Sequence, residues 1–91
     1  MSGLEQYYRE EHWIDFSALF EEPKTNKAYA LLQQRLGDET LSRVIWGIQQ
    51  DHAIHWIESP IPALNGLKPV DCAYDEVLVK RLKECLMRMI R

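Results

Sequence analysis

The sequence predicts an all-α protein, a compact bundle of four to five helices with a Pro/Asn-Gly loop before a long C-terminal helix. No segment alternates apolar and polar residues for long, whereas apolar residues recur at spacings of three and four. Gly37 is a typical helix stop, and Asp38 and Asp75 are typical helix caps. The chain of 91 residues is the size of one domain, and its 46% hydrophobic composition supports one core.

The first two helices are predicted over residues 4–20 and 26–36. The first should present an aromatic-rich face made of Leu4, Tyr8, Trp13 (or His12), Phe16, Leu19 and Phe20. Pro23 and the polar stretch around it end this helix. The second helix ends at Gly37, and its inward side chains should be Ala28, Leu31, Leu32 and Leu36.

Two further helices are predicted between Asp38 and Ser59. Asp38 caps the third, whose inward side should carry Leu41, Val44, Ile45 and Ile48. The interval 47–51 is either a kink or a turn between two short helices. The fourth begins near Asp51 and should carry Ala53, Ile54, Trp56 and Ile57. It must end near Ser59, because a proline disfavours helical geometry at the residue before it.

A loop then leads into the last helix. Asn65-Gly66 is a turn dipeptide, and Pro69 suits the first position of a short helix over residues 69–74. Asp75 caps the last helix. Its apolar stripe should be Leu78, Leu82, Cys85, Leu86 and Met89, flanked by Val79 and Ile90.

Charge is unevenly distributed along the chain. Residues 1–22 are predominantly acidic and residues 80–91 predominantly basic. Either both are solvated helix faces, with the acidic end packed near the basic one, or the basic end meets an acidic or phosphate-bearing partner. The net charge of −3 argues against a nucleic-acid binder. The polar, acidic start and the lack of a membrane-length apolar run lead us to expect a cytoplasmic protein without a membrane segment.

The sequence predicts no metal site, no cofactor and no enzymatic activity. His52, His55 and Glu58 are spaced to share one helical face, but zinc and di-iron sites need three or four converging ligands. The chain has no Cys-x-x-Cys and no pair of Glu-x-x-His motifs. Cys72 and Cys85 lie in apolar helical contexts, where buried, reduced and inert thiols are expected. Adjacent Tyr7 and Tyr8 cannot both face inward easily, so one is a candidate contact residue, and a homodimer through the N-terminal helix is a further hypothesis.

The loop and the last helix together resemble the toxin-binding domain of the Xre/MbcA/ParS-type antitoxins. The resemblance covers roughly residues 41–91. It is carried by Trp56-Ile57, Ser59-Pro60, Ala63-Leu64, Asn65-Gly66, Lys68-Pro69-Val70-Asp71 and the helix from Asp75 to Ile90. Asn65 stands where the family usually has the first glycine of the turn, and Val70-Asp71-Cys72-Ala73 replaces a Leu-rich short helix.

The resemblance implies a protein that binds and neutralises a cognate toxin, a RES-type enzyme that consumes NAD, by occluding its active site. In such a module we expect Trp56, Leu64 and Pro69 to be structural. The candidate toxin-binding residues are Ser59, Asn65, Lys68, Arg88 and Arg91. The alternative is a small dimeric transcriptional regulator of its own promoter. Residues 1–40 are too few for the family's complete helix-turn-helix, so DNA binding is not expected.

Overall fold

The computed structural model describes residues 4–24 and 26–89, and within them it is all-α. Its α-helices are α1 (Glu10–Ser17), α2 (Lys27–Leu36), α3 (Glu39–Gln49), α4 (Ala53–Ile57), α5 (Pro69–Cys72) and α6 (Glu76–Met89). The same residues also form three short 3₁₀ helices, η1 (Leu4–Tyr7), η2 (Gln50–His52) and η3 (Pro62–Leu64). The predicted fold class, with its loop and its long last helix, is confirmed. Ile90 and Arg91 lie outside the described residues.

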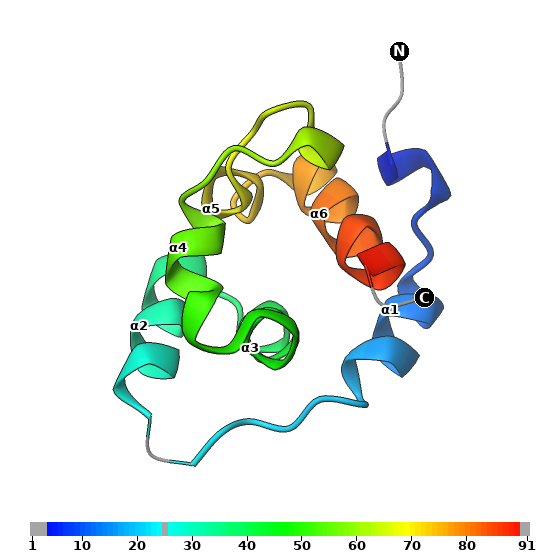
Figure 1. Cartoon of the computed structure of the whole chain (residues 1–91). Helices are drawn as coiled ribbons and strands as arrows, with labels where there is room; N and C mark the ends of the chain where they lie inside the picture. Colours follow the sequence, from blue (N-terminus) through cyan, green and yellow to red (C-terminus); the bar gives the residue numbers. More distant parts are fainter. Residues whose placement is uncertain (1–3, 25, 90–91) are drawn as a thin grey trace.

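The helices pack around one hydrophobic core. α2 and α3 lie against each other, α4 and α5 continue the layer, and α6 packs against α3, α5 and η3 (Figure 1). Fully buried side chains from these elements include Leu32, Leu36, Leu41, Val44, Ile45, Ile57, Leu64, Leu82 and Leu86. On its other side α6 is covered by η1 and α1, so it lies between two layers.

The predicted caps are confirmed by hydrogen bonds. Oδ1 of Asp38 accepts from the amide of Leu41 at 2.9 Å, which satisfies one of the free amides at the start of α3. Oδ1 of Asp75 accepts from the amides of Val77 and Leu78, both at 2.9 Å. Gly37 ends α2 with φ 67°, a left-handed conformation that glycine adopts without steric cost.

The single first helix predicted over residues 4–20 is wrong. The chain forms η1, then turns into extended backbone at Arg9 (φ −130°, ψ 127°), and α1 begins at Glu10. The break places η1 along α6 (Figure 1). Tertiary packing therefore overrides the local helical pattern.

Some predicted inward residues are exposed instead. Leu19, Leu31 and Met89 are exposed by 74%, 42% and 43%. In α6, Glu84 and Met87 are buried although they lie off the predicted stripe. The reason is that η1 and α1 cover the side of α6 that the sequence pattern assigned to solvent.

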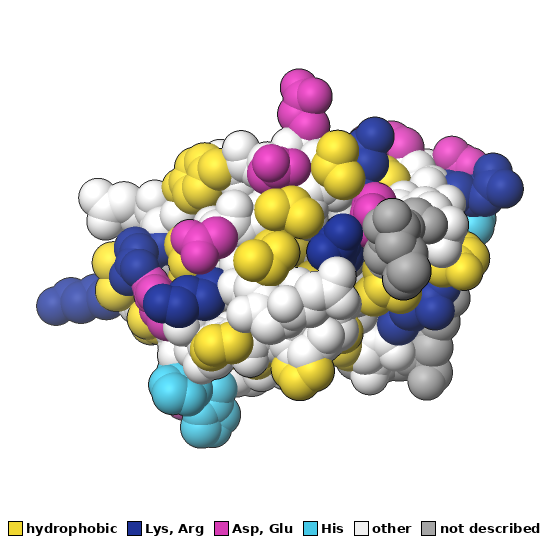
Figure 2. Space-filling view, turned by 90° about the horizontal axis from the view of Figure 1, so that it is seen from above, with side chains coloured by type: hydrophobic (Ala, Val, Ile, Leu, Met, Phe, Trp, Pro, Cys, Tyr) yellow, Lys and Arg dark blue, Asp and Glu magenta, His cyan; other side chains and the backbone are white. Residues whose placement is uncertain are grey.

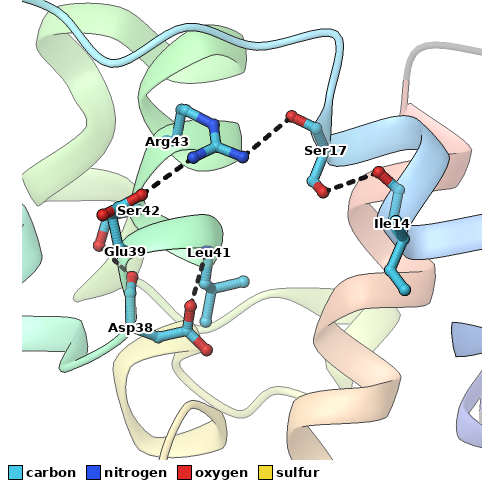
Figure 3. A network of polar contacts seen from close by, with 7 residues as sticks. All are labelled: Ile14, Ser17, Asp38, Glu39, Leu41, Ser42 and Arg43. Carbon is cyan, nitrogen blue, oxygen red and sulfur yellow. Dashed lines mark hydrogen bonds and ion pairs between the residues drawn. The ribbon is translucent and has the colours of Figure 1, made fainter.

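Arg43 links α1 to α3 (Figure 3). Its Nη1 donates to Glu39 Oε1 at 3.1 Å, and its Nη2 donates to the carbonyl of Ser17 at 3.4 Å. The Ser17 hydroxyl donates in turn to the carbonyl of Ile14 at 3.1 Å. One arginine thus satisfies a carbonyl at the last turn of α1 and holds that turn against α3.

The segment after α1 is fixed at Phe20, which lies on Gly47. A Cβ built at Gly47 would meet Cδ1 of Phe20 at 2.1 Å, so the ring occupies the space that any side chain would need. Exchanging a helix-interior glycine for alanine normally stabilises a helix by up to about 1 kcal/mol. We expect Gly47→Ala to lower the free energy of unfolding here, because the ring must move.

The check is a double-mutant cycle by urea denaturation. In a Phe20→Ala background the same Gly47→Ala change should become stabilising, a reversal of sign that only this contact explains. If Gly47→Ala has the same effect in both backgrounds, Phe20 does not pack on Gly47.

Candidate interaction surface

Residues 59–68, here called the 59–68 loop, project from the globule near the start of α6 (Figure 1). The backbone is pinned by its own hydrogen bonds: the carbonyl of Ile61 accepts from Leu64 at 2.9 Å and from Gly66 at 3.0 Å. The amide of Ile61 donates to the carbonyl of Leu67 at 3.0 Å. Leu64 anchors the loop in the core at 0% exposure. The loop therefore has a defined shape, and its exposed polar side chains are Asn65 and Lys68.

Three of the five predicted contact residues lie in this loop. Asn65 is exposed and takes the left-handed conformation (φ 58°, ψ 35°), which suits asparagine better than most residues. Lys68 is exposed, and its carbonyl accepts from the amides of Asp71 and Cys72 at the start of α5. Ser59 is half-buried, and its hydroxyl donates to the carbonyl of His55 at 2.7 Å. Asn65 and Lys68 are thus exposed to solvent, while the Ser59 hydroxyl satisfies a carbonyl at the end of α4.

The fourth predicted residue, Arg88, lies at the other end of α6. It is thirteen positions after Asp75, about 20 Å along the helix. Its Nε donates to Oε2 of Glu84 at 2.9 Å, and its guanidinium lies 5.0 Å from the ring centroid of Tyr7. The fifth, Arg91, lies outside the described residues. The candidate residues therefore do not form one cluster, and Arg88 has partners within the chain.

The cationic face of α6 is covered by residues 4–17, here called the N-terminal arm. Arg81 donates to both carboxylate oxygens of Glu5, from Nε at 2.7 Å and from Nη2 at 3.3 Å. This hydrogen bond raises the pKa of Arg81. Nζ of Lys83 lies 5.8 Å from the ring centroid of Tyr8 and 5.3 Å from that of Trp13. Together with the contact between Arg88 and Tyr7, these ion-pair and cation–π contacts engage three cations of α6.

These contacts support the first of the two alternatives for the uneven charge: the acidic end packs near the basic one. The sequence did not identify the partner of Arg81, because Glu5 and Arg81 are 76 positions apart. The opposite charges of the two ends were the only signal. The adjacent tyrosines divide as expected: Tyr7 is exposed by 55%, and Tyr8 is partly buried.

His52 and His55 are both exposed, whereas Cys72 and Cys85 are buried free thiols, as predicted. Within residues 4–24 and 26–89, no group of three or more His, Cys, Asp or Glu side chains is placed to hold a metal ion.

No helix of this part of the chain combines the length and the apolar character needed to cross a membrane. Figure 2 shows acidic and basic side chains interspersed with hydrophobic ones over one face.

Buried phenols and thiols should make the fold sensitive to alkali. Burial raises the pKa of Tyr29, of Cys72 and of Cys85, and burial together with a hydrogen bond to Glu10 raises that of Tyr8. Where a folded-state pKa is raised, the native state holds its proton after the unfolded chain has lost it. The free energy of unfolding should therefore be intact below the ordinary pKa values, 9.0 for thiols and 10.0 for phenols, and fall as the pH rises beyond them.

Tyr29→Phe tests the most deeply buried phenol, which is 3% exposed and whose hydroxyl forms no hydrogen bond with any residue that the structure describes. We expect the variant to stay within about 1 kcal/mol of wild type at neutral pH, because no hydrogen bond is lost. Its stability should fall less steeply above pH 10. Urea midpoints measured at steps from pH 7 to 11 give both slopes, and equal slopes would contradict the assignment to Tyr29.

Comparison with known proteins adds no relative: no family model, no curated protein and no solved structure matches this chain.

Proposed function

We propose that this protein is an antitoxin or immunity-type inhibitor that binds a cognate toxin and occludes its active site. The proposed toxin is a RES-type enzyme that consumes NAD. The observation that carries the proposal is the ordered structure of the 59–68 loop, one of the segments on which the resemblance to toxin-binding domains rests. It is exposed, and its backbone is fixed by hydrogen bonds around the buried Leu64.

Preorganisation is the physical argument for binding. A loop that is already ordered loses little conformational entropy when it meets a partner, so more of the contact energy appears as affinity. Asn65 and Lys68 are exposed on this frame and supply hydrogen-bond donors and a positive charge. Arg88 receives less weight as a contact residue, because Glu84 and Tyr7 already engage its guanidinium.

The alternative of a DNA-binding regulator has less support. A DNA reader needs free cations for phosphates, and Arg81, Lys83 and Arg88 of α6 are engaged with the N-terminal arm and Glu84. A gel-shift with upstream DNA at low salt remains its test.

The proposal is tested by co-expressing the protein with the product of its neighbouring gene. We expect the two to co-purify, growth to be restored and cellular NAD to be preserved. If toxicity persists and no complex is recovered, the proposal fails.

Matched variants locate the contact. Lys68→Glu should weaken toxin binding about tenfold or more, since it reverses a charge on the loop. Lys27→Glu makes the same change on an exposed lysine at the start of α2, away from the loop (Figure 1), and should bind as wild type. Asn65→Gly removes the amide while keeping a residue that tolerates positive φ. Equal binding by all three variants would place the contact outside the loop.

A further inference from the structure

We draw no further inference here: the strongest candidate, the outer face of α1 where the exposed Ile14 lies among Glu10, Glu11 and Asp15, is an acidic helix surface, and nothing in the structure shows what covers it.

Discussion

Leu64→Ala should lower the free energy of unfolding by about 2–5 kcal/mol, the range for truncating a buried leucine. The side chain is 0% exposed, and its loss leaves a cavity between the 59–68 loop and α6. The amide of Leu64 donates to the carbonyl of Ile61, so the truncated side chain belongs to a residue whose backbone helps to shape the loop. Urea denaturation followed by Trp fluorescence measures the loss.

The neighbouring residue supplies the control. Ala63 is exposed, so Ala63→Ser should change the free energy of unfolding by no more than about 0.5 kcal/mol. Toxin affinity should fall for Leu64→Ala even at temperatures where it is folded, because its loop is no longer preorganised. A Leu64→Ala protein as stable as Ala63→Ser would show that Leu64 does not anchor the loop.

The local chemistry of the sequence predicted the fold well from the end of α2 onward. Asp38, Gly37, Pro69 and Asp75 each act where a side chain or a restricted φ decides the backbone of its immediate neighbours. Such signals work over three or four residues, so they can be read without knowing what packs above them. Leu64 and Pro69 are buried, as expected of structural residues. Trp56 is only half-buried, so truncating it should cost less than the roughly 3–5 kcal/mol of a buried tryptophan.

The first part of the fold depends on a partner that lies far away in sequence. The break between η1 and α1 follows from packing on α6, and the helical pattern of residues 4–20 contains no sign of it. The same packing buries Glu84 and Met87. It also engages Arg88, which the sequence assigned to a partner protein. Free basic residues and internally paired ones look alike in a sequence, since the difference lies in the opposing surface.

Trp13→Ala should cost about 3–5 kcal/mol, a large share of the stability of a domain this size. Trp13 is 3% exposed, its ring centroid lies 6.1 Å from that of Phe16, and Lys83 lies beside it. Ile14→Ala is the matched control on the next residue of α1, because its side chain is largely exposed and should matter by no more than about 0.5 kcal/mol. Equal urea midpoints for the two variants would contradict the burial of Trp13.

Amide hydrogen exchange would show how the loss of stability in Trp13→Ala is distributed over the structure. Trp13 anchors α1 in the core, whereas α3 is anchored there by its own buried side chains Leu41, Val44 and Ile45. If the arm is a separate cooperative unit, its amides should lose protection in Trp13→Ala while those of α3 keep most of theirs. A uniform loss across α1 and α3 would show that the arm and the globule unfold together.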